Sequence, residues 1–412
     1  MRLLLGRNDH ARTPLQTLGM IAAILVALIL TTERAVAVSA WVNISNNAGA
    51  STYPSLGLDG TMLIAMWVDN TPGNDEIFMA RSADTGAIWG TPVDLSLTSG
   101  ASSMYDWAFA GRYLYVVWAD GSPADIVFRR SVDGGLTFKA AWDVSVNSGQ
   151  STVPRVALSG GSNVYLTWQD DTTGNDEVYF KRSLDAGQTF GNVMNLSNTA
   201  DSSEAPSIYT LGPHVWVLWT EVLGPYFHPD IYLRHSSNGG ATFGSTVVVS
   251  PPAGDSVDPS MAVAGPNVYV VWTDLDSITT YDQPMFRVSS DGGASFGAVT
   301  VLSNSFSHKH HPFIMVAGTF VYVTWADGDW TGGNEIYLRR SIDKGATWQA
   351  VRNLSNSAGS SIASAFSWTL AGTQLYVAWP DTTPGNWEIF YRKSNDTGAS
   401  FNSTLNLSMF AD

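Results

Sequence analysis

Hydrophobic and polar residues alternate in short segments along most of the chain, with turn residues between the segments. Residues 154–197 contain one set of four such segments: PRVAL, NVYLTWQD, NDEVYFKRS and NVMNLS. Alternation with a period of two, together with many Val, Tyr, Trp and Phe residues, is typical of β-strands. Each set of segments therefore predicts four strands, which short turns join into one small antiparallel sheet.

One octapeptide recurs between the third and fourth segments of each set. Its copies are SADTGAIW at 82, SVDGGLTF at 131, SLDAGQTF at 183, SSNGGATF at 236, SSDGGASF at 289, SIDKGATW at 341 and SNDTGASF at 394. Their third residues are Asp84, Asp133, Asp185, Asn238, Asp291, Asp343 and Asp396, with separations of 49, 52, 53, 53, 52 and 53 residues. Catalysis needs one aspartate in one place, whereas a fixed period indicates a structural repeat.

We therefore expect the octapeptide to build the turn between the third and fourth strands. Its glycine, such as Gly135, suits a positive φ, and its Asp and Ser oxygens can accept hydrogen bonds from the backbone amides of the turn. Asn238 supports this structural role, because an amide oxygen accepts the same bonds. The aromatic residue that ends the octapeptide, such as Phe138, is expected to bury itself in the sheet.

Seven such sheets arranged radially predict an all-β fold, a seven-bladed β-propeller of four-stranded antiparallel blades. The pattern SxDxGxTF or SxDxGxTW resembles the Asp-box (BNR) repeat of sialidases, sortilin-type receptors and other glycan-related propellers. The resemblance covers nearly all of residues 41–408 and implies one Asp-box in each blade. It leaves the activity open, because that family includes enzymes, receptors and assembly factors.

The first 40 residues precede the repeat and are typical of an export signal. Basic residues come before the apolar run LGMIAAILVALIL at 18–30, and the small residues AVAVSA follow it. The run has 13 residues, fewer than the roughly 20 that a membrane span needs, so we expect a signal peptide over 1–40, with an uncleaved membrane anchor as the alternative. Residues 41–412 are then a single propeller domain, secreted or on the cell surface.

Composition excludes some partners of this domain. The formal net charge of the chain is -15, and a nucleic-acid partner would require a basic surface. Bound cations suit an acidic chain better, so calcium is a possible ligand, although no cofactor is required. The sequence contains no cysteine, so the exported domain must be held together by its core.

The fourth-strand pattern occurs once more than the first-strand pattern. WVNIS at 41–45 and LNLS at 405–408 both carry it, so one terminal copy is surplus or the two share the last blade. A strand from the N-terminus could close blade seven and protect its edge. The pattern itself favours neither terminal copy.

Strand direction divides the turns between two faces of the propeller. The turns after strands one and three, which include the octapeptides, share one face; the turns after strands two and four share the other, which we call the open face. On the open face an acid follows each second-strand Trp by two residues: Asp69, Asp120, Asp170, Glu221, Asp274, Asp327 and Asp381. These carboxylates either cap the following turns or form a ring that attracts divalent cations, and they are the candidate metal ligands.

Four segments of the open face depart from the repeat, in blades four to six: 221–230, 274–284, 307–312 and 327–335. They supply the candidate ligand-binding residues Tyr226, Phe227, His228, Asp276, Tyr281, Asp282, His308, His310, His311, Asp329 and Trp330. Aromatic rings beside carboxylates suit sugars, because apolar sugar faces stack on rings while hydroxyls bond to acids. Three histidines also suggest a zinc or copper site, but His310 and His311 would point opposite ways on an extended strand.

The resemblance to sialidases implies three arginines that bind the substrate carboxylate, an Asp acid/base and a Tyr nucleophile with a Glu partner. Most arginines instead recur at the end of the third strand, on the octapeptide face: Arg81, Arg130, Arg182, Arg234, Arg287, Arg340 and Arg392. Only Arg155 is well placed as a catalytic candidate. We therefore expect a non-catalytic module that binds a glycan or an extracellular protein, with an exo-acting glycoside hydrolase of sialidase type as the alternative.

Overall fold

A computed structural model describes residues 42–224, 228–251, 254–275, 281–303, 307–329, 332–361 and 367–408. The regular secondary structure of these residues consists of seven four-stranded antiparallel sheets, each with its strands in chain order. The fold is a seven-bladed β-propeller, as the sequence predicts. In the described part of the chain no helix is long and apolar enough to span a membrane. The predicted signal peptide lies outside the described residues.

The chain divides into two compact units, the first formed by Met1–Asp94 and Ser364–Asp412. Its first blade contains β1 (Ser51–Asp59), β2 (Met62–Asp69), β3 (Glu76–Ser82) and β4 (Val93–Asp94). Its second blade, the seventh of the chain, contains β25 (Ser367–Ala371), β26 (Gln374–Asp381), β27 (Glu388–Ser394) and β28 (Leu405–Asn406).

The second unit, Leu95–Ala363, contains the five blades from two to six. Blades two and three contain β5 (Ser102–Ala110), β6 (Tyr113–Gly121), β7 (Ala124–Ser131), β8 (Trp142–Asp143), β9 (Ser151–Ser159), β10 (Asn163–Asp170), β11 (Glu177–Ser183) and β12 (Met194–Asn195). Blades four and five contain β13 (Ser202–Leu211), β14 (His214–Leu223), β15 (His228–Ser236), β16 (Val247–Val248), β17 (Asp255–Ala264), β18 (Asn267–Leu275), β19 (Gln283–Ser289) and β20 (Thr300–Val301). Blade six contains β21 (Lys309–Ala317), β22 (Phe320–Asp329), β23 (Gly332–Ser341) and β24 (Arg352–Asn353).

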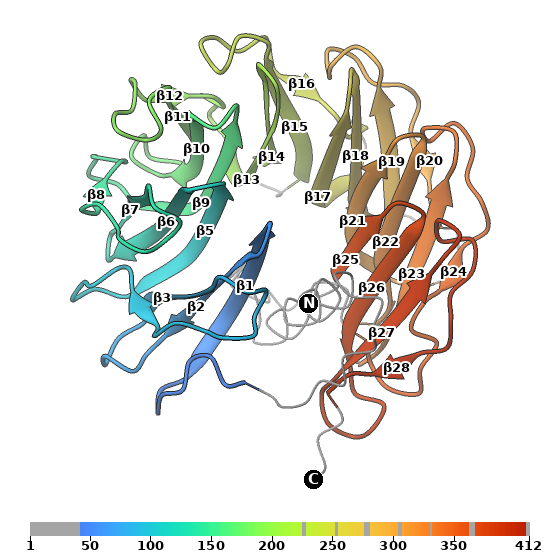
Figure 1. Cartoon of the computed structure of the whole chain (residues 1–412). Coiled ribbons are helices and arrows are strands. Elements are labelled where there is room, and N and C mark those ends of the chain that lie inside the picture. Colours follow the sequence, from blue (N-terminus) through green and yellow to red (C-terminus); the bar gives the residue numbers. More distant parts are fainter. Residues whose placement is uncertain are drawn as a thin grey trace, which may run out of the picture. The chain divides into compact units, whose positions relative to one another are not determined.

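Within the second unit the first strand of each blade is innermost and the short fourth strand is outermost (Figure 1). The second strands are the most buried, because neighbouring blades cover both of their faces. All residues from Leu114 to Ala119 on β6, for example, are buried. Such a strand is a nearly continuous hydrophobic run, whereas the other strands alternate.

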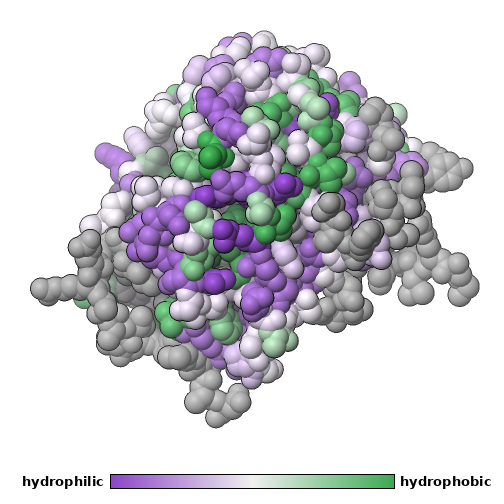
Figure 2. Space-filling view, turned by 90° about the vertical axis from the view of Figure 1, so that its right-hand side faces the viewer, coloured by the Kyte–Doolittle hydropathy of each residue, from purple (hydrophilic) through white to green (hydrophobic). Residues whose placement is uncertain are grey.

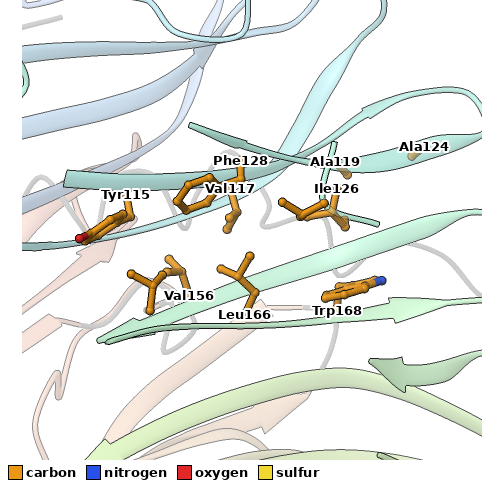
Figure 3. Packing of buried hydrophobic residues seen from close by; sticks show 11 residues of the cluster. Tyr115, Val117, Ala119, Ala124, Ile126, Phe128, Val156, Leu166 and Trp168 are labelled. Carbon is orange, nitrogen blue, oxygen red and sulfur yellow. The ribbon is translucent and has the colours of Figure 1, made fainter. Parts of the chain in front are cut away.

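Within the second unit, successive blades pack face to face through large side chains. Figure 3 shows Tyr115, Val117 and Phe128 of blade two facing Leu166 and Trp168 of blade three, all of them buried. In the second unit, Trp168, Trp219, Trp272 and Trp325 each belong to such a layer with the preceding blade, where burying one large side chain contributes about 1.5 to 3 kcal/mol.

A β-bulge interrupts the first strand of every blade whose bulge region is described. In blade three, Val153 has a φ of 51° and immediately precedes Pro154. The equivalent residues with left-handed φ values are Tyr53, Met104, Ala205, Asp258 and His311. A bulge adds one residue to the strand and so changes the face toward which the preceding side chains point.

The structure assigns the fourth strand of blade seven to the C-terminal copy of the repeated pattern. Leu405 and Asn406 form β28 and pair with Tyr391 and Phe390 of β27. Residues 42–50 form no strand, although Ile44 packs against the hydrophobic cluster of the first blade. The N-terminal copy is therefore the surplus one in the described part of the chain.

The surface contains both hydrophilic and hydrophobic residues. On the face drawn in Figure 2, hydrophilic residues form continuous stretches with hydrophobic residues between them. Several exposed hydrophobic side chains lie on turns, such as Leu136 within an octapeptide and Val146 after β8. Single exposed hydrophobic residues of this kind are normal in globular proteins.

Candidate functional site

The octapeptide aspartates are hydrogen-bond acceptors within their own turns. Asp185 Oδ1 accepts bonds from the Ser183 hydroxyl at 2.7 Å and the Thr189 amide at 2.9 Å, and its Oδ2 accepts the Thr189 hydroxyl at 2.6 Å. Asn238 accepts the equivalent Ser and Thr bonds through Oδ1, and its Nδ2 donates to the Thr242 hydroxyl at 2.9 Å. The hydrogen bonds of these side chains are therefore made within the turn and stabilise its conformation.

These contacts also lower the pKa of the aspartates. Burial alone would raise the pKa of Asp185, but hydrogen bonds from Thr189 and Ser183 outweigh burial and lower it to about 2. Such a carboxylate stays ionised at neutral pH and is a poor general acid.

In blades three and four, the aromatic residue that ends the octapeptide packs against the preceding blade. The Phe190 ring lies 5.0 Å from the Phe128 ring of blade two in an edge-to-face arrangement, and Phe243 lies 5.0 Å from Phe180 of blade three. The sequence predicts that this ring is buried in its own sheet. In these two blades it instead packs between its own blade and the preceding one.

The second-strand acids bind the chain segments around them. Asp170 Oδ2 accepts bonds from the Ser151 hydroxyl at 2.6 Å and the Trp168 indole at 3.1 Å, and its Oδ1 accepts the Thr172 amide at 2.9 Å. Asp69 has the same kinds of partner, and hydrogen bonds from Thr71 and other groups outweigh its burial and lower its pKa to about 2. These acids therefore connect the incoming first strand, the Trp and the following turn.

The hydrogen bonds of these carboxylates compete with the coordination of a metal ion. Asp69 and Asp170 already use both carboxylate oxygens for protein hydrogen bonds. Within the described ranges no group of three or more His, Asp or Glu side chains could hold a metal ion. A role for calcium stays a prediction.

A second set of carboxylates, which the sequence analysis missed, lies on the third strands opposite the second-strand acids. Glu177 lies opposite Asp170 in the register of β10 and β11. Ser197 of the NLS segment donates its hydroxyl to Glu177 and accepts the Val178 amide at 2.8 Å. Other blades repeat this pair of acid and serine: Asp125 and Ser145, Asp230 and Ser250, Glu335 and Ser355, Glu388 and Ser408. The sequence signal was an acid near the start of the third strand in every blade except blade five, which has Gln283, together with a Ser after the fourth strand.

The third-strand arginines occupy two adjacent positions, where the sequence analysis treated them as one. Arg234, two residues before its octapeptide Ser, donates to the Gly244 carbonyl at 2.8 Å and the Leu196 carbonyl at 2.9 Å. Arg182, one residue before its Ser, donates to Gly239 of the next blade at 2.8 Å. Adjacent strand residues point to opposite faces, so the two positions have different partners. Both sets connect blades through backbone carbonyls.

Arg155, the catalytic candidate, lies on β9 directly after the bulge. Its Nη1 donates to the carbonyl of Pro154 at 2.9 Å. The neighbouring amide of Val156 donates to Asp106 Oδ2 of blade two at 2.9 Å.

Three histidines of the open face each contact an aspartate of a neighbouring segment in blades four to six. His228 Nδ1 lies 2.8 Å from Asp255 Oδ1, which joins β15 of blade four to β17 of blade five. His308 Nδ1 lies 3.0 Å from Asp282 Oδ2, and His311 Nδ1 lies 3.2 Å from Asp258 Oδ2, both between blade six and blade five. We call these contacts the three His–Asp pairs.

The imidazole is the more exposed partner in each pair. Side-chain exposures are 63% against 31% for His228 and Asp255, 34% against 13% for His308 and Asp282, and 40% against 23% for His311 and Asp258. Because Nδ1 faces the carboxylate in each pair, Nε2 is the nitrogen of His308 and His311 that a ligand could contact. A carboxylate behind Nδ1 fixes the tautomer and the orientation of the ring.

The local environment shifts the neighbouring histidines in opposite directions. Burial lowers the pKa of His311, but the hydrogen bond and charge of Asp258 outweigh burial, so its pKa is raised. Burial lowers the pKa of His310 to about 4, and the charge of His311 adds to this shift. His310 is therefore neutral at pH 7, while His311 keeps its proton to a higher pH than an ordinary histidine.

The predicted ligand residues are placed only in part. His310 and His311 rings lie 5.2 Å apart and nearly perpendicular, and the Tyr281 ring lies 5.7 Å from that of His308. Asp329 ends β22 and pairs with Gly332 of β23. Tyr226, Phe227, Asp276 and Trp330 lie outside the described residues.

Asp255 and Asp258 are site residues that the sequence analysis missed. The premise that His310 and His311 lie on a regular extended strand was wrong, because His311 has a φ of 52° within the bulge. Asp258 has the equivalent position in blade five, with a φ of 53°. The sequence does contain a signal for the bulge, because a Pro follows the bulge residue in most first strands.

No family model matches the chain, and no curated protein sequence matches it. Among solved structures, the polysaccharide lyase Uly1 has a TM-score of 0.55 at 10% identity, over 90% of this chain and 95% of the lyase. A PL25 ulvan lyase bound to -[GlcA(1-4)Rha3S]- has a TM-score of 0.52 at 10% identity, over 87% of this chain and 94% of that chain. The GH93 α-L-arabinofuranosidase of Fusarium graminearum has a TM-score of 0.46 at 14% identity, over 74% of this chain and 93% of that chain. The two lyase similarities show a shared propeller fold.

Proposed function

We propose that the protein is an exported, non-catalytic Asp-box propeller that binds carbohydrate on the open face of blades four to six. The observation that carries this proposal is the set of three His–Asp pairs, which gather on one face and join neighbouring blades. Export rests on the expected signal peptide, and membership of the Asp-box propellers rests on the repeated octapeptides.

The chemistry of the pairs suits sugar hydroxyls. A carboxylate accepts hydrogen bonds from a hydroxyl, and an imidazole either donates or accepts through Nε2. Tyr281 beside His308 adds an aromatic ring on which an apolar sugar face can stack. Both lyases that share the fold act on polysaccharides by their names, which agrees with a carbohydrate ligand.

A second candidate function is glycan cleavage, which the pair of His311 and Asp258 favours. A carboxylate on Nδ1 with Nε2 as the remaining nitrogen is the arrangement of a general base. Cleavage of sialidase type would depend on Arg155 as one of the arginines that bind the substrate carboxylate. We rank cleavage second because the third-strand arginines donate to backbone carbonyls instead.

The deciding experiment incubates the purified full chain, with added calcium, with sialylated and neutral oligosaccharides and follows the sugars by mass spectrometry. Depletion of intact sugars from solution supports binding. Release of a terminal sugar supports cleavage and overturns the non-catalytic proposal. If no sugar is depleted or released, the carbohydrate proposal is wrong.

Two variants assign the result to the open face. His311→Gln removes the imidazole that contacts Asp258 and should weaken binding about tenfold, as loss of a charge-assisted hydrogen bond does. His214→Gln is the matched control, because His214 contacts His235 Nε2 at 2.9 Å near the octapeptide face. Equal binding by both variants and the unaltered chain would place the ligand elsewhere.

A further inference from the structure

Blade four differs from blades three and five at three adjoining positions beside the octapeptide face. They are His214, Trp216 and His235, which stand where blade three has Asn163, Tyr165 and Arg182 and blade five has Asn267, Tyr269 and Val288. His214 begins β14, and His235 lies one residue before the octapeptide Ser that ends β15. We call His214 and His235 the histidine pair.

One hydrogen bond joins the two imidazoles of the histidine pair. Nδ1 of His214 lies 2.9 Å from Nε2 of His235, so one of these nitrogens donates and the other accepts. The rings are nearly parallel, with an interplanar angle of 15°. Both also lie beside the indole of Trp216, at centroid distances of 5.5 Å for His214 and 4.8 Å for His235. Because Trp216 is buried, the pair rests on a fixed surface of blade four.

The histidine pair belongs to the contact between blades four and five. Trp216 Nε1 donates to the carbonyl of Gly292, in the octapeptide of blade five, at 2.7 Å. A Cβ added at Gly292 would lie 3.5 Å from His235 Cε1, so this backbone packs directly against the imidazole. In blade three, Arg182 donates to the equivalent carbonyl, that of Gly239 in blade four. A guanidinium stays charged at all ordinary pH values, whereas the imidazoles of blade four titrate near neutral pH.

The hydrogen bond limits how many protons the folded pair can bind. In the neutral pair a single N–H lies between the two facing nitrogens, and one further proton can bind to an outer ring nitrogen without breaking that bond. A second further proton would place an N–H on both facing nitrogens, which are 2.9 Å apart, so the bond must break. The unfolded chain binds a proton on each ring below the ordinary pKa near 6.5. In acid the folded pair therefore binds fewer protons than the unfolded chain.

Burial acts in the same direction. Burial, together with the nearby His214, lowers the pKa of His235. The charged groups on the adjoining elements have partners of their own: Arg234 donates to backbone carbonyls, and Asp291 accepts hydrogen bonds within its turn. A histidine whose pKa is lowered in the folded state stabilises the fold above the ordinary value near 6.5, and this stabilisation is lost as the pH falls below it.

We propose that the histidine pair is an acid-sensitive joint between blades four and five. At neutral pH the two rings share their hydrogen bond and support the octapeptide of blade five. In acid a second proton separates the rings and loosens that octapeptide, as protonation does at other histidine contacts. The joint lies on the octapeptide face, so it is independent of the proposed carbohydrate site on the open face.

Amide hydrogen exchange of the full chain at pH 7.5 and pH 5.5, corrected for the intrinsic exchange rate at each pH, tests the joint. The octapeptide of blade five, residues 289–296, contains the Gly292 amide, which donates to the Pro266 carbonyl at 2.9 Å. Its protection should fall about tenfold at pH 5.5, because one proton changes an equilibrium tenfold for each pH unit below the ordinary pKa.

The octapeptide of blade three, residues 183–190, is the matched control for this measurement. Arg130 of blade two holds its Ala186 carbonyl at 2.8 Å, and a guanidinium does not titrate in this range. Its protection should be the same at both pH values. Equal loss in both octapeptides, or loss in neither, overturns the joint.

His214→Asn together with His235→Val removes both titratable rings and supplies the residues that blade five has at these positions. In this variant the octapeptide of blade five should keep its protection at pH 5.5. The same loss as in the unaltered chain would show that another group is responsible and would overturn the joint.

His214→Asn alone repeats the test, so that it does not depend on the folding of one variant. An amide can donate to His235 Nε2 or accept from it, so the hydrogen bond survives protonation of that ring. In urea denaturation the unfolding equilibrium constant of the unaltered chain should rise up to about tenfold more than that of the variant between pH 6.5 and pH 5.5. Equal rises overturn the joint.

Discussion

At the residue scale, the recurring carboxylates are acceptors for nearby backbone and hydroxyl groups. Asp185 organises its own turn, and Asp170 ties the incoming first strand to the Trp and to the next turn. A carboxylate repeated in every blade therefore serves the propeller scaffold. The residues that depart from the repeat, such as His311, are the ones that remain for a ligand.

The octapeptide aspartate predicts a contrast between two substitutions at one site. Asp185→Ala removes the acceptor for Ser183 and Thr189 and should lower the free energy of unfolding by about 1 kcal/mol. Asp185→Asn should have little effect, because Asn238 makes the equivalent bonds in blade four. Urea denaturation at pH 7 measures both; equal losses would show that the negative charge, rather than the acceptor geometry, stabilises the turn.

Acid should weaken the same turns. The pKa of Asp185 is lowered in the folded state, so its contribution is complete above its ordinary pKa near 4 and is lost as the pH falls toward about 2. Asp185→Asn should therefore reduce the dependence of stability on pH between 4 and 2. Urea denaturation of both proteins between pH 4 and pH 2 measures this dependence. If the free energy of unfolding changed with pH equally in both, the expectation would be wrong.

At the element scale, neighbouring blades meet at the octapeptide glycine. A Cβ added at Gly187 would lie 2.8 Å from Phe128 Cζ of blade two, at a backbone φ of 72°. Gly187→Ala should therefore cost about 2 to 4 kcal/mol, from the left-handed backbone and the overpacking together. Gly212→Ala is the control, because its φ is 58° with open space around it, and should cost about 1 to 2 kcal/mol. Denaturation that gave equal costs would exclude a role for the contact with Phe128.

The contact between β17 and β21 should depend on pH. Because the pKa of His311 is raised in the folded state, its pairing with Asp258 stabilises the fold below the ordinary pKa near 6.5 and is lost as the pH rises through the folded value. His310 has the opposite effect on stability. Its pKa is lowered to about 4 in the folded state, so the unfolded chain binds this proton first as the pH falls and folding is then destabilised. His308 and the buried Lys309 also lie nearby.

Asp258→Asn tests the His311 effect, because it removes the negative charge that His311 contacts. The same charge opposes the lowering of the His310 pKa, so its loss also makes His310 harder to protonate. We expect the variant to lose more stability at pH 5.5 than at pH 8.5, relative to the unaltered chain. Thermal melting at both pH values measures this difference. A loss that is the same at both would show that Asp258 acts without the charge of His311.

The strands could be predicted from the sequence because their alternation and turn residues repeat in every blade. The fold class and the octapeptide turns follow from that repetition. The pair of His311 and Asp258 could not, because the bulge places two residues of β21 opposite one residue of β22 and breaks the alternation on which strand faces are assigned. Likewise, the partner of Glu177 is Ser197, which lies 20 residues away and meets it only when the fourth strand has formed.

At the scale of the whole molecule, the last blade depends on the end of the chain. Ser408, just after β28, accepts the amide of Ile389 at 2.8 Å and donates to the buried carboxylate of Glu388. Deleting residues 405–412 removes β28 and leaves both groups without this hydroxyl. A buried polar group that loses its partner costs about 1 to 3 kcal/mol, so the deletion should lower the free energy of unfolding by more than one such amount.

Urea denaturation of the deleted chain checks this expectation, with Ser45→Ala as the control. Ser45 belongs to the N-terminal copy of the same pattern, where its hydroxyl donates to Asn43 at 3.1 Å and no strand forms nearby in residues 42–50. Its loss should change stability by less than about 0.5 kcal/mol, as at most surface sites. If the deleted chain were as stable as the whole one, the N-terminal copy would have to supply the missing fourth strand. The two copies would then be interchangeable, and the propeller would have two ways to complete blade seven.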